Sequence, residues 1–238
     1  MMNDTIKLLM ERKSVRVFEE RNISPEIKSA ILGAAMRAPT AGNSMLYSII
    51  DVTDQSLKEA LAVNCDNQPF IAQAPLVLVF CADYHRWYRK FKLAGCEDVR
   101  PPELSDLILS TNDAVIAAHA ACVAAESFGI GSCYIGDIVE NFEKNRELLK
   151  LPHQVAPVSM LVFGYPTEQQ KNRKQTTRFA ESSVIFENSY RELSEDELLD
   201  MMPNDRTRAF HDRKYVSEFA MEMVRSVKAI YENWNHED

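Results

Sequence analysis

Arginine, serine and arginine alternate near the start of the chain, in residues 12–16 (RKSVR). Successive side chains of an extended backbone point to opposite sides, so Arg12, Ser14 and Arg16 would share one side. Two guanidinium groups and a hydroxyl suit a phosphate, because the planar arginine fork matches phosphate oxygens. The alternative is a solvated run of charge after a helix. The spacing therefore indicates either a phosphate clamp or ordinary surface.

A second basic cluster lies far along the chain and contains Lys171, Arg173, Lys174 and Arg178. It too could be plain surface. The protein has a net charge of −8, so two isolated basic patches give it a reason to collect a small anion. We expect the two patches, from opposite ends of the chain, to converge on one phosphate.

The glycines of residues 129–136 (GIGSCYIG) imitate a dinucleotide-binding fingerprint only superficially. Their third glycine is misplaced, and the segment runs from a helix into a strand. A dinucleotide turn must run from strand into helix, so that the pyrophosphate meets the helix N-terminus. A P-loop and a Gly-x-Ser-x-Gly elbow are also absent from the sequence.

Cysteine and histidine form neither a disulfide pattern nor a metal pattern. The five cysteines are odd in number, and four of them lie in or near apolar stretches, where a free thiol behaves as a small buried hydrophobe. The five histidines are dispersed; His119 lies within the apolar helix predicted at residues 104–128, and each is assigned a structural role. No metal site is predicted.

The bulk composition excludes two classes of partner. The acidic net charge and scattered basic residues do not suit nucleic acid, which needs a clustered basic surface. The longest wholly apolar run, residues 74–82, is far shorter than the roughly 18 residues of a membrane span. Because no secretory signal is visible and the thiols are expected to be reduced, the expected compartment is the cytoplasm.

The helices and strands that would position these groups are predicted from the spacing of apolar residues and from cap residues, prolines and glycines at their ends. Ser24-Pro25 predicts the N-cap and first residue of a helix that stops at Pro39. Further helices are predicted at residues 5–12, 55–63, 104–128 and 216–234, and strands at residues 47–52, 76–81, 133–135 and 158–163. Residues 76–81 are apolar throughout, which is typical of a strand covered on both faces.

The helix at residues 104–128 is the most apolar in the chain and is expected to end at Gly129 as C-cap. A helix that is apolar all round must be buried on every side. One subunit of this size rarely provides that burial, whereas a dimer interface does. We therefore predict a homodimer built on this helix.

In order along the chain, several stretches resemble the FMN-dependent nitroreductases and flavin reductases, in the branch with a long C-terminal excursion. They are residues 12–18 (RKSVRVF), 38–43 (APTAGN), 67–70 (NQPF) with the strand ending at 80–83 (FCAD), 129–131 (GIG) leading into 134–136 (YIG), and 163–166 (FGYP). The resemblance covers positions 5–179; each stretch is weak alone, and the order and spacing carry it.

The resemblance implies an α+β fold, with a mixed central sheet flanked by helices. Two subunits would interlock about the long helix, with one FMN in each of two interface clefts. Residues 1–238 would form a single domain, with a core at 1–179 and a C-terminal arm or cap at 180–238, a segment too thinly apolar to hold its own core.

The resemblance also assigns cofactor-binding residues by motif position. Arg12, Ser14, Arg16, Lys174 and Arg178 would hold the flavin phosphate and ribityl chain, and Lys13 would contribute through its backbone. Thr40 and Asn43 would come from the partner subunit, and Gln68 would reach the pyrimidine edge of the ring. The turn formed by Tyr134, Ile135, Gly136 and Asp137 would lie along the flavin, with the Gly136 amide facing N5.

The implied activity is transfer of hydride from NADPH or NADH to FMN, followed by reduction of a nitroaromatic, a quinone or free flavin. One site would serve both substrates in turn, which gives ping-pong kinetics. The chemistry belongs to the cofactor, and no catalytic side chain is nominated. Two alternatives stay open: a non-catalytic flavin-binding module for storage or sensing, and another flavin reaction such as reductive dehalogenation.

Five positions leave questions open. Met45 stands where many relatives carry a polar residue, and Asp137 stands where some carry a second glycine, so a carboxylate would lie near the reduced, anionic ring. Arg206, Arg208 and Arg225 could contact the extra phosphate of NADPH, but surface salt bridges explain them equally well.

Overall fold

A four-stranded sheet forms the centre of the molecule. The computed structural model describes residues 2–236. Its strands are β1 Tyr47–Asp51, β2 Leu76–Asp83, β3 Gly131–Ile135 and β4 Val155–Gly164, in the order β1-β2-β4-β3. Neighbouring strands pair antiparallel throughout, and parallel pairing within residues 2–236 is confined to the isolated bridge between Ser14 and Ser132. The α+β class and all four predicted strands are confirmed.

Helices surround this sheet and continue into the C-terminal segment. They are α1 Asp4–Glu11, α2 Pro25–Met36, α3 Gln55–Asn64, α4 Phe70–Gln73, α5 His85–Leu93, α6 Leu104–Ser127, α7 Phe142–Leu148, α8 Glu168–Asn172, α9 Glu195–Met201, α10 Asn204–Lys214 and α11 Glu218–Trp234, with short 3-10 turns η1 Ala41–Asn43, η2 Gly136–Val139 and η3 Glu181–Ser183. The predicted caps are confirmed: Ser24 accepts from the Ile27 amide, and Gly129 follows α6 with φ +70°.

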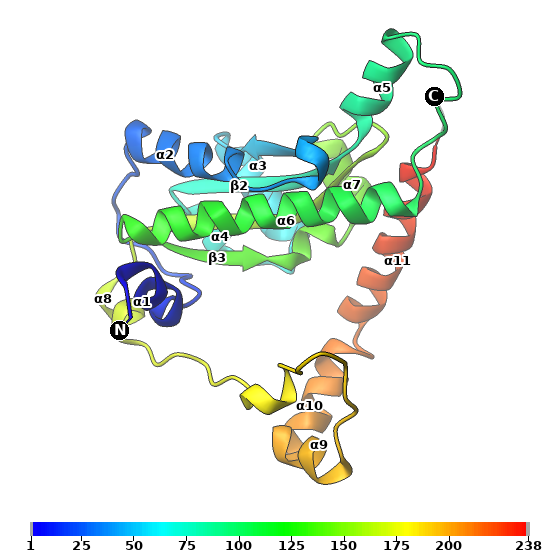
Figure 1. Cartoon of the computed structure of the whole chain (residues 1–238). Helices are drawn as coiled ribbons and strands as arrows, with labels where there is room; N and C mark the ends of the chain where they lie inside the picture. The colour runs from blue at the N-terminus through cyan, green and yellow to red at the C-terminus, as the bar shows by residue number, and fades with distance from the viewer. Residues whose placement is uncertain (1, 237–238) are drawn as a thin grey trace.

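The two faces of the sheet pack into two separate apolar clusters. Along β2, Val77 and Val79 join the cluster beneath α3 and α4, whereas Leu78 and Phe80 join the cluster beneath α2 and α6. This alternation follows from the two-residue period of a strand. Every residue of β2 is buried, as expected of a strand covered on both faces. Figure 1 shows α6 running along the sheet beside α2.

Helix α6 buries only one of its faces within this chain. A row of alanines, including Ala114, Ala117 and Ala121, packs onto the sheet and is fully buried. The other face exposes apolar side chains: Ile108 is 53% and Ile116 is 42% exposed. By length and composition the helix could cross a membrane, but its alanine face belongs to the core of this protein.

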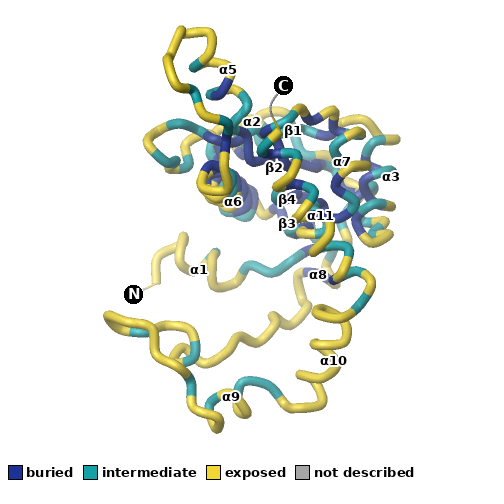
Figure 2. The backbone as a smooth tube through the Cα atoms, turned by 90° about the vertical axis from the view of Figure 1, so that its right-hand side faces the viewer, coloured by how far each residue is buried: buried dark blue, intermediate teal, exposed yellow. Residues whose placement is uncertain are grey.

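The C-terminal segment leaves the core and then returns to it. Helices α9 and α10 lie apart from the sheet, contain no buried residues and are largely exposed (Figures 1 and 2). Helix α11 returns, and its Ile230 and Trp234 are buried against Phe142 in a third apolar cluster. The last helix is therefore part of the core packing, which the sparse apolar content of this segment did not predict.

Candidate functional site

The two basic segments meet at one cavity of about 570 Å³. Its walls come from the last turn of α1 and the segment after it, from the segment after α8, and from one residue of α6. The lining residues are Leu9, Met10, Arg12, Lys13, Ser14, Arg16, His119, Arg173, Lys174, Gln175, Thr176 and Arg178. The structure thus brings together the predicted phosphate-clamp residues from both ends of the chain, and we name this cavity the basic pocket.

The extended backbone of residues 12–16 is fixed by an added strand-like contact with β3. The Val15 amide donates to the Ser132 carbonyl at 2.9 Å, and Val15 itself is buried. A Cβ at position 131 would collide with the Val15 side chain, so Gly131 permits the close approach. With Val15 directed into the protein, Ser14 and Arg16 line the pocket.

The second basic segment is tied to the first by main-chain acceptors. Lys13 Nζ donates to the carbonyls of Lys171 and Arg173, at 2.6 and 2.7 Å. Arg173 in turn donates to the Ser14 carbonyl, and Gln175 Nε2 donates to the Met10 carbonyl at 2.6 Å. The Lys13 and Arg173 side chains therefore hold the pocket together.

Arg12 presents positive charge in the pocket wall with few partners. Its Nε and one terminal nitrogen are buried and have no hydrogen-bond partner among residues 2–236. Glu126 of α6 lies behind it, with Nε and Oε1 3.9 Å apart, which is an ion-pair distance but too long for a hydrogen bond. Burial raises the Glu126 pKa to about 7, more than the Arg12 charge lowers it. The wall is thus incompletely neutralised, as an anion site requires.

A second group of predicted residues lies at the end of β3. Gln68 Nε2 donates to the Cys65 carbonyl at 2.8 Å and to Asp137 Oδ2 at 2.5 Å. Tyr134 is half-buried, and burial raises its pKa; Ile135 is buried, and Gly136 opens the turn η2. None of these five residues lines the basic pocket.

Arg16 connects the two groups. It lines the basic pocket, and its guanidinium lies 5.9 Å from the centre of the Phe70 ring. Phe70 begins α4, two residues after Gln68. The basic pocket and the end of β3 are therefore adjoining parts of one surface.

A third group lies on the loop between α2 and β1, away from the basic pocket of its own chain. Thr40 Oγ1 accepts from the Met45 amide at 3.2 Å, and Asn43 is exposed with φ +57°. The Asp113 carboxylate of α6 accepts from the amides of Ala41 and Leu46, at 2.9 and 3.1 Å. This buried carboxylate fixes both ends of the segment that carries Thr40 and Asn43.

Sequence reasoning missed Asp113, and it did not name His119 as a pocket residue. Asp113 is 2% exposed, and a carboxylate within an apolar helix was the available signal. His119 is exposed and lines the basic pocket. His119 lies on the outward face of α6, and the structural role predicted for it stays a prediction. The four cysteines predicted to be buried are buried: Cys65, Cys81, Cys122 and Cys133.

Comparison with known proteins decides the family. Residues 9–165 match the nitroreductase family. This chain belongs to that family. The sequence-based resemblance is therefore confirmed.

Named relatives of this nitroreductase-family chain are redox enzymes. The oxygen-insensitive NADPH nitroreductase of Salmonella typhimurium is 36% identical over 194 residues, which is 82% of this chain and 78% of that protein. The FMN reductase (NAD(P)H) of Bacillus subtilis is 33% identical over 200 residues, covering 83% and 78% of the two chains. The structure of the NADPH:FMN oxidoreductase of Vibrio harveyi complexed with NAD⁺ matches with a TM-score of 0.81 and 26% identity, over 96% of this chain and 98% of that one.

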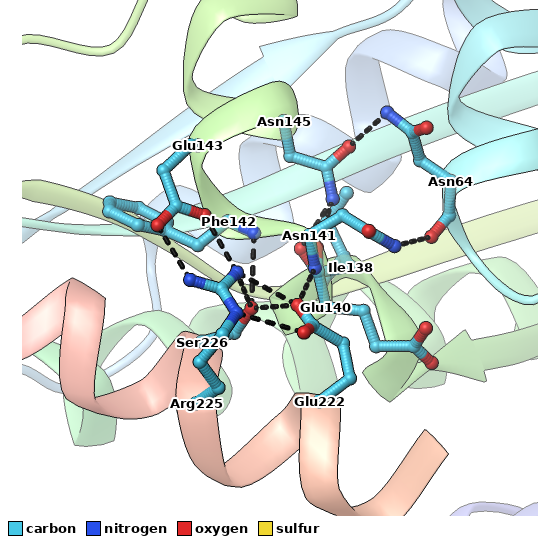
Figure 3. Close-up of polar contacts among 10 residues, drawn as sticks. All are labelled: Asn64, Ile138, Glu140, Asn141, Phe142, Glu143, Asn145, Glu222, Arg225 and Ser226. Carbon is cyan, nitrogen blue, oxygen red and sulfur yellow. Dashed lines mark hydrogen bonds and ion pairs between the residues drawn. The ribbon is translucent and has the colours of Figure 1, made fainter. Parts of the chain in front are cut away.

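In this nitroreductase-family chain, Arg225 is occupied by ion pairs (Figure 3). Its two terminal nitrogens each donate to Glu143 at 2.7 Å, and its Nε donates to Glu222 at 2.8 Å. The arginine hydrogen bonds lower the Glu222 pKa to about 2. Two roles were considered for Arg225, a contact to the extra phosphate of NADPH and a surface salt bridge. The structure contains the salt bridge. Arg206 and Arg208 lie on α10 and are exposed.

The same cluster attaches α11 to the core. Glu222 Oε1 accepts from the Asn141 amide at 3.1 Å, and Ser226 Oγ accepts from the Phe142 amide at 3.2 Å. These two amides lie at the start of α7, where helical amides have no partner within the helix. Side chains of α11 thus cap α7 (Figure 3).

The donor set of the basic pocket fits a flavin phosphate. Orphaned guanidinium nitrogens of Arg12, the hydroxyl of Ser14, and the cations Arg16, Lys174 and Arg178 offer the charged donors that phosphate oxygens accept. The adjoining end of β3 supplies an amide side chain and main-chain groups beside an aromatic ring.

Proposed function

We propose that this chain is an FMN-dependent oxidoreductase that takes hydride from NADPH or NADH and passes electrons to a small acceptor. The observation that carries the proposal is the convergence of residues 12–16 and 173–178 on one incompletely neutralised basic pocket. The names of the Salmonella and Bacillus relatives support both the flavin and the nicotinamide.

Each predicted residue has a place in this proposal. The phosphate and ribityl chain would be held by Arg12, Ser14, Arg16, Lys174 and Arg178. The Lys13 side chain holds the two segments of the pocket together. At the end of β3, the flavin ring would be bordered by Gln68, Tyr134, Ile135, Gly136 and Asp137. Thr40 and Asn43 lie outside the basic pocket of their own chain, which supports their contribution from a partner subunit.

The flavin supplies hydride and electron transfer when bound, and the protein supplies binding and electrostatics. Arg12 and Arg16 place positive charge beside the site, which favours an anion there. The Gly136 amide is the proposed donor toward N5. One open face would serve the nicotinamide and the acceptor in turn, which predicts ping-pong kinetics with nitroaromatics, quinones or free flavin as acceptors.

The proposed assembly is a homodimer about α6. The exposed apolar side chains of its outer face, among them Ile108, Leu109, Val115 and Ile116, support this arrangement, because a soluble chain seldom leaves such a row uncovered. We place the protein in the cytoplasm, since its four buried cysteines are free thiols.

An absorption spectrum before and after anaerobic NADPH tests the cofactor and its reduction together. The purified protein should be yellow and should bleach on reduction. A colourless protein that takes up no FMN on reconstitution would sink the proposal. Bound flavin that stays oxidised under NADPH would favour a storage or sensing module.

Charge-removing variants test the role of the basic pocket itself. Replacing Arg178 with Ala should weaken FMN binding by roughly tenfold, because a charge-assisted hydrogen bond is lost, while riboflavin binding changes little. Arg191→Ala is the matched control, since Arg191 pairs with Glu197 outside the pocket. Equal loss of FMN and riboflavin affinity would show that Arg178 does not face the phosphate.

A further inference from the structure

The amide group of Gln68 is held in one orientation by two neighbours that can only accept hydrogen bonds. One is the Cys65 carbonyl, 2.8 Å from Nε2, and the other is Asp137 Oδ2, 2.5 Å from Nε2. An ionised carboxylate and a main-chain carbonyl have no hydrogen to donate. Both must therefore be met by the NH₂ end of the amide, which has two hydrogens to give.

This arrangement leaves the carbonyl end of Gln68 as the available group. Both hydrogens of Nε2 are used, and Oε1 accepts no hydrogen bond within residues 2–236. Gln68 is half-buried, so its Oε1 is placed to accept from a ligand. Without Asp137, the Cys65 carbonyl alone would hold the NH₂ end, so the amide would be fixed less firmly and could turn more readily.

We propose that Asp137 is a positioning residue that fixes Gln68 so that it offers an acceptor, and not a donor, to the bound ring. The inference rests on the proposed flavin site. The pyrimidine edge of isoalloxazine carries one donor, N3–H, between two carbonyl oxygens. An acceptor at Gln68 selects that N–H, whereas the opposite orientation would select a carbonyl.

Asp137 is well placed for this role because it belongs to a hydrogen-bonded turn. It lies in the turn η2 directly after β3, and the Glu140 amide donates to its carbonyl at 3.0 Å. The backbone of Gln68 is fixed independently. Its main-chain amide donates to the Ala62 carbonyl at 2.9 Å, and its main-chain carbonyl accepts from the Ile71 amide at 3.1 Å. Two fixed backbones thus hold one side-chain hydrogen bond.

A purely structural clip between these segments is the competing explanation, and a ratio of affinities separates the two. Binding of FMN and of 3-methyl-FMN, which lacks the N3 hydrogen, is measured by flavin fluorescence for each protein. Because both flavins are measured on the same preparation, a loss of folding stability does not change the ratio. The variants are Gln68→Ala, Asp137→Ala and Asp137→Asn.

The wild-type protein should prefer FMN over 3-methyl-FMN by roughly tenfold, the size expected for one buried hydrogen bond. Gln68→Ala should reduce the preference to within about twofold. Asp137→Ala should reduce it, because the Cys65 carbonyl alone then holds the amide and Gln68 turns more readily. Asp137→Asn should keep most of it, since asparagine retains an acceptor oxygen.

Glu140→Gln is the matched control. Glu140 is a buried carboxyl three residues further on, and its Oε1 has no hydrogen-bond partner in the part of the chain that the structure describes, so this variant should keep the wild-type ratio. An unchanged ratio in Asp137→Ala overturns the role of Asp137, and an unchanged ratio in Gln68→Ala overturns the placement of Gln68. A wild-type protein that binds neither flavin overturns the proposed function as well as this inference.

Discussion

The protonation state of Glu126 contributes to the pH dependence of the protein's stability. Its side chain is 16% exposed, and burial raises its pKa from 4.5 to about 7 although Arg12 lies nearby. The folded state therefore binds a proton more tightly than the unfolded state. The resulting stabilisation is complete below pH 4.5 and is lost as the pH rises through 7.

Glu126→Gln removes this dependence. The variant should be more stable than the wild type at pH 8, by at most about 3 kcal/mol, and should match it at pH 4.5. Urea denaturation of the flavin-free protein at several pH values measures the difference. Parallel stability curves across this range would contradict the assignment of the raised pKa to Glu126.

Residues that act through local backbone geometry were predictable, whereas those that depend on distant packing were not. Alternation alone placed Arg12, Ser14 and Arg16 on one side, because that property needs only an extended segment. Exposure of His119 depends on which face of α6 meets the sheet, and the sequence pattern was nearly uniformly apolar there. Asp113 was not predicted because its partners are main-chain amides, and contacts to the main chain do not affect the spacing of side-chain types in the sequence.

At the scale of elements, Asp113 makes α6 the support of the loop that carries Thr40 and Asn43. Asparagine at position 113 would offer one acceptor oxygen to two amides, so one end of the loop would be released. Asp113→Asn should weaken FMN binding by roughly tenfold while keeping the preference for FMN over riboflavin, since the basic pocket is untouched. Equilibrium titration with the two flavins measures both quantities.

A second buried aspartate of the same helix provides the control. Asp106 accepts from Arg100 and from the Glu103 amide, away from the loop. Asp106→Asn should lower the melting temperature without changing FMN affinity in the folded protein. If both variants weakened FMN binding equally, the effect would belong to α6 as a whole and not to the loop.

The ion pairs of Arg225 give α11 a structural role that can be separated from nucleotide binding. Arg225→Ala should lower the melting temperature by a few degrees, because the link from α11 to Glu143 of α7 is lost. The ratio of activities with NADPH and NADH should stay within about twofold of wild type. Glu143→Gln should lower the melting temperature similarly, and a selective loss of NADPH use in Arg225→Ala would contradict this role.

Most helices and strands could be predicted from the sequence, but their arrangement in space could not. Apolar runs located β2 and β4, and Ser24, Pro25 and Gly129 marked helix ends. The order β1-β2-β4-β3 and its antiparallel pairing arise from contacts between distant segments, which no local pattern encodes. For the same reason, the docking of α11 through Trp234 was not foreseen.

At the scale of the whole molecule, the outer face of α6 decides whether the protein can complete its site alone. Because Thr40 and Asn43 lie outside the basic pocket of their own chain, a monomer would lack the contacts proposed to come from a partner. An aspartate at Ile116, which is 42% exposed, would place a charge in the proposed interface, where desolvation without a partner is costly.

Ile116→Asp should therefore shift the protein from dimer to monomer in analytical ultracentrifugation, and FMN affinity should fall by at least about tenfold in the same samples. Val63→Asp is the control, since Val63 of α3 is 62% exposed and lies off α6; it should leave both properties unchanged. A monomeric Ile116→Asp protein that binds FMN as tightly as wild type would show that each chain completes its own site. A wild-type protein that is already monomeric at micromolar concentration would remove the interface from α6 altogether, and the exposed apolar row would then need a different partner.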